Sequence, residues 1–104
     1  MSEEQKKQAI SEEQKVAFYN RLKEELEKND QWPVKYMYKF IVPNKEENEE
    51  EVKKAFEGKE IDFHKNYSKS GKYVSLTIVT NEDSADDIIQ RYRSLEHIEG
   101  LVAL

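Results

Sequence analysis

Alternating apolar and polar residues predict two well-defined strands in the middle of the chain. Residues 34–42 carry Val, Tyr, Tyr, Phe and Val at the even positions and a mixed set at the odd ones. Residues 73–79 carry Val74, Leu76 and Ile78 at the even positions. A period of two is typical of a strand with two different faces. The even positions of both strands are therefore expected to face a helical layer, and the odd positions a partly exposed face.

Helical spacing of apolar residues predicts three helices. The first, about residues 11–29, begins at an N-cap, Ser11. The second follows Pro43, with Asn44 as its N-cap and Glu47 closing a capping box. The third begins after Ser84, and its apolar stripe is the clearest of the three. That stripe consists of Ala85, Ile88, Ile89, Tyr92 and Leu95.

Two shorter strands, at residues 61–67 and 101–104, complete the predicted elements. The order is then one helix followed by β-α-β-β-α-β, which is the split βαβ arrangement. Right-handed crossovers place both later helices on one face of an antiparallel sheet of strand order 4-1-3-2. We therefore predict an α+β protein with one ferredoxin-like two-layer domain over residues 11–104, including the added N-terminal helix. Residues 1–10 are read as a disordered polar tail, and residues 81–83 as a turn.

Composition limits the partners and the compartment. The 104 residues fit one domain, and the net charge of −5 argues against a broad basic surface for nucleic acid. No cysteine is present, so neither disulfides nor thiolate metal sites are expected. Neither an apolar run long enough to cross a membrane nor the apolar core of a signal peptide is visible. We expect a cytoplasmic protein.

The residues that commonly carry catalysis do not form a recognisable set. His64 and His97 lack a partner at metal-ligand spacing, and the acidic clusters lack a calcium-loop pattern. No glycine-rich phosphate loop and no Ser-His-Asp arrangement is apparent. The sequence therefore predicts a protein that is not an enzyme, without cofactor, metal or catalytic residues.

Positive charge gathers at one predicted surface of this acidic chain. The odd positions of the two central strands form its floor, and the hairpin loop 68–72 forms its rim. The candidate interaction residues are Lys35, Lys39, Lys69, Gly71, Lys72, Tyr73 and Ser75. Lysines at such a face indicate an acidic protein or a small anion as the partner. An RNA-recognition surface is a third reading, but Tyr73 is its only well-placed aromatic residue.

Several motifs together resemble a known family. They are Phe18-Tyr19-Asn20-Arg21-Leu22, Trp32-Pro33, the run from Tyr36 to Pro43 and the run from Ser68 to Ser75. In these the chain resembles the small bacterial YbeD-like family, whose members are single-domain proteins of unknown function. The family loop is usually Pro-Ser-Ser-Lys-Gly, whereas this chain has Tyr67-Ser68-Lys69-Ser70-Gly71. The resemblance implies an α/β fold similar to regulatory ACT-like domains, and no known catalysis.

Two functions follow as expectations. The first is a non-catalytic regulatory or protein-interaction domain that acts through the open sheet face and the loop 68–72. The alternative is an ACT-type sensor that binds a small molecule at the interface of a homodimer, as the resemblance implies. Against the sensor stands the loop Val42-Pro43-Asn44-Lys45, which has no glycine to let a ligand approach the backbone.

Overall fold

The computed structural model describes residues 12–104, which divide into two units at the junction of Asp30 and Gln31. The first unit contains helix α2, Glu12–Glu27. Tyr19 is its buried apolar residue, whereas Val16 is exposed. The predicted cap, Ser11, and the predicted tail lie outside the described residues. The second unit contains all the strands and the two remaining helices among the described residues.

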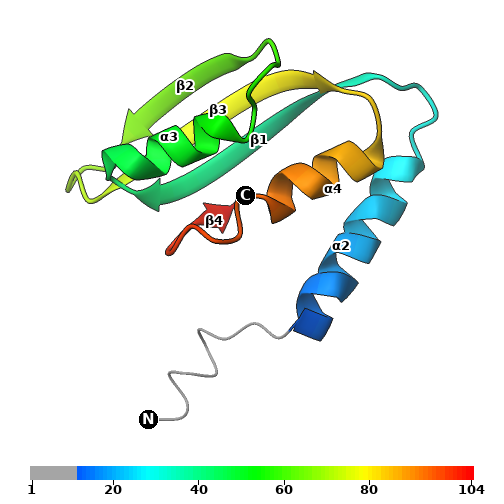
Figure 1. Ribbon diagram of the computed structural model, residues 1–104, viewed down its shortest axis with the longest axis horizontal. Coiled ribbons are helices and arrows are strands. Elements are labelled where there is room, and N and C mark those ends of the chain that lie inside the picture. The colour runs from blue at the N-terminus through cyan, green and yellow to red at the C-terminus, as the bar shows by residue number, and fades with distance from the viewer. Residues whose placement is uncertain (1–11) are drawn as a thin grey trace. The chain divides into compact units, whose positions relative to one another are not determined.

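Four strands form one open antiparallel sheet in the second unit (Figure 1). They are β1 (Val34–Pro43), β2 (Asp62–Tyr67), β3 (Tyr73–Glu82) and β4 (Val102–Ala103). Their order is β2-β3-β1-β4, which is the predicted order read from the opposite edge. The long strands β1 and β3 are central, as the sequence predicted.

The register of β1 and β3 places their apolar positions on one face. Tyr38 lies opposite Ile78, and Phe40 lies opposite Leu76. All four side chains are fully buried. The odd positions of both strands are exposed or half-buried, so the predicted difference between the two faces is confirmed.

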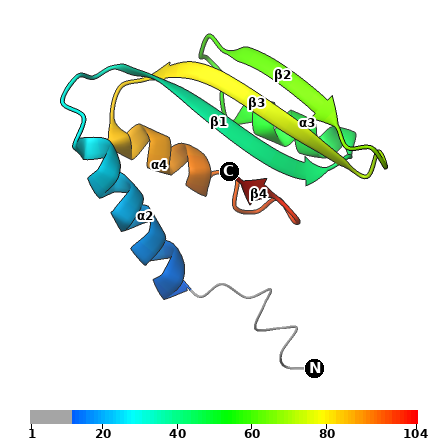
Figure 2. The same cartoon turned by 180° about the vertical axis from the view of Figure 1, so that it is seen from behind.

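Helices α3 (Glu46–Lys54) and α4 (Ala85–Arg93) pack on the buried face of the sheet. The ring of Tyr38 touches Phe56, just after α3, at a centroid distance of 5.0 Å, and Tyr92 of α4 at 5.3 Å. Because one side chain of the sheet meets both, the two helices share that face. Helix α3 lies in front of the sheet in Figure 1 and behind it in Figure 2.

The N-cap of α4 is confirmed, but that of α3 was predicted wrongly. The backbone N–H of Asp87 donates to the Ser84 hydroxyl at 3.1 Å. In α3 the cap position is Lys45, and no side chain bonds there. The Asn44 side chain instead donates to the carbonyl of Gly71 at 2.9 Å. The Asn44 side chain is thus directed to the β2–β3 hairpin, and its oxygen does not accept from the first N–H groups of α3.

Strand β3 also extends beyond its predicted end. It continues to Glu82, which pairs with Val34. The prediction of a turn at residues 81–83 was therefore wrong at Asn81 and Glu82. Pairing with the full length of β1 overrides the local turn preference of these polar residues.

Candidate functional site

The exposed face of the sheet carries apolar and basic side chains together. Met37 is 60% exposed, Tyr73 is 48% exposed and Val102 is 50% exposed. Lys35 and Lys39 of β1 are exposed on the same face, because they alternate with the buried residues of that strand. We call this surface the open face: the odd positions of β1 and β3, the even positions of β2, and Val102.

The structure places the predicted interaction residues along the open face rather than in one cluster. Lys39 lies opposite Thr77, two residues along β3 from Ser75. Lys35 lies opposite Asn81, and Tyr73 opposite Pro43. At about 3.3 Å per residue, Lys35 and Tyr73 are separated by roughly 26 Å along the sheet. One small anion cannot touch both ends of this set.

The hairpin Ser68–Lys72 is a well-braced loop at one end of the open face. Gly71 has a positive φ of 78°, a conformation that favours glycine. Its N–H donates to the Ser68 carbonyl at 2.9 Å, and the Ser68 hydroxyl accepts from the N–H of Tyr73 at 3.2 Å. With the bond from Asn44, these contacts fix the loop that presents Lys69 and Lys72. Both lysines are exposed.

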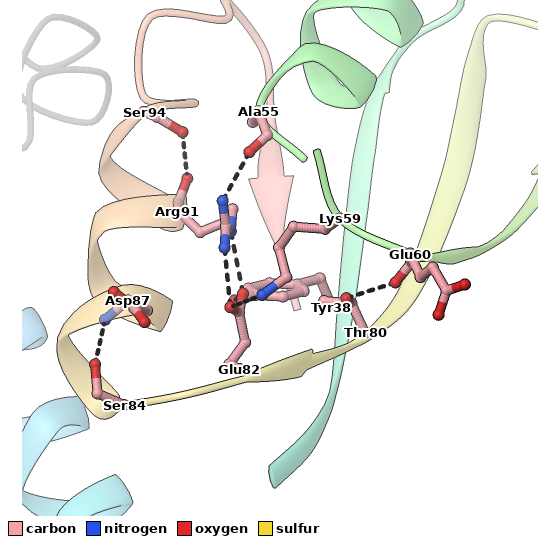
Figure 3. Close-up of polar contacts among 10 residues, drawn as sticks. All are labelled: Tyr38, Ala55, Lys59, Glu60, Thr80, Glu82, Ser84, Asp87, Arg91 and Ser94. Carbon is pink, nitrogen blue, oxygen red and sulfur yellow. Dashed lines mark hydrogen bonds and ion pairs between the residues drawn. The ribbon is translucent and has the colours of Figure 1, made fainter. Parts of the chain in front are cut away.

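A second cluster, which sequence reasoning missed, surrounds the buried carboxylate of Glu82 (Figure 3). Arg91 of α4 donates through Nε to Oε2 at 3.0 Å and through Nη2 to Oε1 at 2.9 Å. Lys59 Nζ donates to Oε1 at 3.0 Å, and the hydroxyl of Tyr38 donates to Oε2. Arg91 also donates through Nη1 to the Ala55 carbonyl at 2.9 Å. The cluster therefore joins both central strands, α4 and the segment after α3.

The partners of Glu82 set its protonation. Burial by itself raises the pKa of the carboxyl group, but hydrogen bonds from Arg91, Tyr38 and Lys59 outweigh burial and hold the pKa below its ordinary value. Burial, followed by the adjacent Glu82 carboxylate, raises the pKa of the Tyr38 hydroxyl well above its usual range. Glu82 is thus ionised and Tyr38 neutral at pH 7. This arrangement is typical of a structural ion-pair network, because the carboxylate of Glu82 is paired with Arg91 and Lys59 of the same chain.

A signal for Glu82 was present in the sequence. It continues the even series of β3 after Val74, Leu76, Ile78 and Thr80, so its parity places it on the buried face. A buried carboxylate requires charged partners. Those partners come from distant parts of the chain, and no local pattern identifies Arg91 or Lys59 as the pair.

Both histidines are exposed residues of the second unit. Within residues 12–104, no group of three or more His, Cys, Asp or Glu side chains is placed to hold a metal ion. His97 Nε2 lies 3.0 Å from a carboxylate oxygen of Glu51 on the surface. His64 is an exposed residue of β2, on the open face. No helix in the described part of the chain is long and apolar enough to cross a membrane.

An open groove of about 640 Å³ lies near the first residues of β1 and β2. It is lined by both acidic and basic side chains, together with uncharged residues. The charged ones are Lys35, Lys59, Glu60 and Asp62. Two positive and two negative groups give the groove no net charge, so it does not favour an anion over other ligands.

Comparison with protein families gives a match over most of the chain. A family model described as "Protein of unknown function (DUF493)" matches residues 27–104. Searches of curated proteins and of solved structures found no match. The match covers the sheet, helices α3 and α4 and both clusters described above. It includes most of the segment that carries the motifs noted in the sequence.

Proposed function

Because the chain belongs to the DUF493 family of proteins of unknown function, we propose a role for it from its own surface. The proposed role is that of a non-catalytic protein-interaction domain, regulatory in character. It binds a protein partner across the open face and the hairpin Ser68–Lys72. The order β-α-β-β-α-β with two helices on one face of the sheet supports the ferredoxin-like layout that such a role would use.

The observation that carries the proposal is that exposed apolar side chains lie beside lysines that have no ion-pair partner within residues 12–104. Met37 and Val102 are at least half exposed on the open face. Lys35 and Lys39 form no ion pair with any residue of the described segment 12–104, although the whole chain has a net charge of −5. Apolar groups rimmed by charge are typical of protein-binding surfaces.

The extent of the surface supports a protein rather than a small anion as the partner. Lys35 and the hairpin lie roughly 26 Å apart along the strands, by the rise per residue of a strand. A protein interface buries about 800 Å² on each partner, which is a patch of this length. A small anion would need its donors within hydrogen-bond distance of one another, and these lysines are spread along the sheet.

Two neighbouring tyrosines offer a matched test. Tyr73 is on the open face and 48% exposed, whereas Tyr67, at the end of β2, is 56% exposed and pairs with Val74 of the buried face. We would replace each in turn by the photo-crosslinking residue benzoylphenylalanine in cells. The proposal predicts a discrete crosslinked protein from position 73 that is absent from position 67.

Charge reversal provides the specificity control. Lys69→Glu with Lys72→Glu should reduce the adduct from position 73 by about tenfold or more. Lys53→Glu with Lys54→Glu makes the same change in charge at two exposed residues of α3, which covers the other face of the sheet, and should leave the adduct intact. Equal adducts from positions 67 and 73, or insensitivity to reversal at Lys69 and Lys72, would contradict the proposal.

A groove favours the small-molecule sensor as a second candidate. This groove, of about 510 Å³, lies beside the β1–α3 loop and is lined by residues that include Lys45, Glu51 and His97. Its carboxylates, from Glu47, Glu51 and Glu99, could accept from the amino group of an amino acid, and Lys45 could donate to the carboxylate. A thermal-shift screen of amino acids and short carboxylic acids tests this candidate. A shift that is lost in Lys45→Ala supports it, and no shift with any compound contradicts it.

A further inference from the structure

The backbone groups of β1 point alternately toward β3 and away from it. The N–H of Asn44 donates to the Lys72 carbonyl at 2.9 Å, which continues the pairing of the even residues of β1 with β3. On the other side, the N–H of Leu104 donates to the Lys39 carbonyl at 2.9 Å. The odd residues Lys35 and Met37 therefore direct their N–H and C=O groups to the same side as Lys39.

Strand β4 covers only part of that side. It pairs with Phe40 and Ile41, and Leu104 reaches Lys39. Toward the start of β1, no strand of the described segment lies beside Lys35 and Met37. β1 thus presents a free edge from Val34 to Tyr38, although it is an inner strand over its other half. Unpaired backbone groups at a sheet edge are a template for an added strand.

The side chains at this free edge indicate which strand would fit. Lys35 and Met37 are exposed on the open face, and Lys39 follows at the next odd position. Leu104 limits any added strand to the edge before Lys39. On the added strand, a side chain paired with Lys35 would lie beside its ammonium group. A side chain paired with Met37 would lie diagonally from Lys35 and from Lys39, within reach of both. Acidic side chains at these positions would meet positive charge on each side.

A second copy of the chain fits this edge less well. Antiparallel pairing centred on Tyr36 would bring the two Lys35 side chains onto diagonal positions of the new strand pair, where like charges repel. Each copy also carries a net charge of −5. We propose that the free edge of β1 accepts an extended acidic segment of another protein as an added strand. This inference rests on the proposed function and names the partner's chemistry and mode of binding.

The outer edge of β2 also lacks a neighbouring strand in the described sheet, but its chemistry differs. Lys65, whose backbone points outward there, forms an ion pair with Glu49 at 2.9 Å. The Phe63 ring lies 4.8 Å from the ammonium of Lys53. These side chains are engaged with α3 on the helix-covered face. The edge of β2 therefore serves as the internal control for the edge of β1.

The test uses a synthetic hexapeptide, Thr-Glu-Val-Glu-Thr-Glu, with blocked ends, and the ¹⁵N-labelled chain. In a strand its glutamates share one face, and its backbone is free to pair. We expect titration to shift the amide signals of Lys35 and Met37 and to slow their hydrogen exchange. A peptide with lysine in place of each glutamate should bind at least tenfold more weakly. The glutamate peptide should also bind at least tenfold more weakly when the backbone nitrogens that donate to β1 are methylated. This peptide keeps its charge but loses those N–H donors.

Proline substitutions locate the edge. Met37→Pro removes an N–H that points away from β3, so the ladder with β3 stays intact, and binding should fall at least tenfold. Lys65→Pro makes the equivalent change at the edge of β2 and should leave binding unchanged. Thermal unfolding confirms that each variant is folded, and the N-methylated peptide decides the matter if Met37→Pro is not.

The outcomes separate this inference from the proposed function. Equal binding of the N-methylated and unmodified peptides would show attraction by charge without strand addition, and it would overturn the inference alone. So would loss of binding in Lys65→Pro with retention in Met37→Pro, or no binding of the glutamate peptide at millimolar concentration. The crosslinks from positions 73 and 67 decide the proposed function independently, because they do not depend on the peptide.

Discussion

Arg91 donates two parallel hydrogen bonds to the carboxylate of Glu82, from Nε to Oε2 at 3.0 Å and from Nη2 to Oε1 at 2.9 Å. The guanidinium matches the carboxylate in shape, which makes this the strongest form of ion pair in proteins. Its Nη1 donates to the Ala55 carbonyl, and its Cζ lies 5.1 Å from the centroid of the Phe56 ring. One side chain of α4 thereby joins the end of β3 to the end of α3.

Removal of the charge on Glu82 should destabilise the fold strongly. Glu82→Gln keeps the size of the side chain but leaves Arg91 and Lys59 without their counter-ion in a buried site. Breaking a buried pair in this way costs about 3–5 kcal/mol. Urea unfolding measures this loss. Glu57→Gln, at an exposed position after α3, should change the free energy of unfolding by less than about 0.5 kcal/mol. Equal effects in the two variants would contradict the central role of Glu82.

The contribution of Glu82 should depend on pH in a defined direction. Its pKa in the folded protein lies below the ordinary value for Glu, so the folded state favours the ionised form. The stabilisation is complete above the pKa of the unfolded chain, about 4.3, and is lost as pH falls through the folded pKa.

The difference in unfolding free energy between the wild-type chain and Glu82→Gln measures this contribution. It should be largest and constant near pH 6–7 and should shrink below about pH 4.3. Glu49 also has a lowered pKa, chiefly through its hydrogen bond from Lys65. The contribution of Glu49 cancels in the difference, because the wild-type chain and Glu82→Gln both contain it. A difference that stays constant from pH 7 to pH 3 would count against the assignment.

The hydroxyl of Tyr38 should contribute separately from its ring. Tyr38→Phe preserves the ring contacts with Phe56 and Tyr92 but removes one donor to the buried carboxylate of Glu82. A hydrogen bond to a charged group contributes about 1.5–3 kcal/mol, so the loss should lie in that range. Tyr67→Phe, at an exposed position, is the matched control. Chemical denaturation of the two variants gives the comparison, and a loss at Tyr38 no larger than at Tyr67 would refute it.

Two glycines with similar backbones should respond differently to alanine. Gly71 and Gly100 have φ values of 78° and 81°, so a side chain costs about 1–2 kcal/mol at either position. A Cβ at Gly71 would meet no atom within 4 Å, whereas one at Gly100 would lie 3.0 Å from Cγ of Pro43. Gly100→Ala should therefore lower the melting temperature more than Gly71→Ala does. The reverse order in thermal unfolding would disprove the steric argument.

The sequence indicated the sheet well because its signals are local. The alternation in β1 and β3 depends on neighbouring residues, and the Ser84 cap depends on a contact three residues away. The errors occurred where a distant partner decides the structure. Glu82 has the local character of a turn residue, but its strand pairing and its ion pairs come from β1, α4 and the segment after α3. Asn44 likewise bonds to Gly71 rather than to its own helix.

The candidate surface was predictable in part for the same reason. Period-two parity placed Lys35, Lys39 and Ser75 on the exposed side of the sheet, where the structure has them. Their spacing along the sheet follows from register, which single residues do not specify. The free edge of β1 was beyond sequence reasoning, because it results from how few residues of β4 pair with β1.

The shortness of β4 has a consequence for dynamics. Two ladder pairs and the bond from Leu104 to Lys39 attach it to β1, and Val102 and Leu104 are at least half exposed, so its detachment loses few contacts. β4 should therefore detach in a local opening that leaves β1 and β3 paired, and its amides should exchange faster than those of the central strands. Each such opening frees the backbone of Ile41 and the carbonyl of Lys39. The length of unpaired edge on β1 therefore varies with time, and it is set by how often β4 detaches.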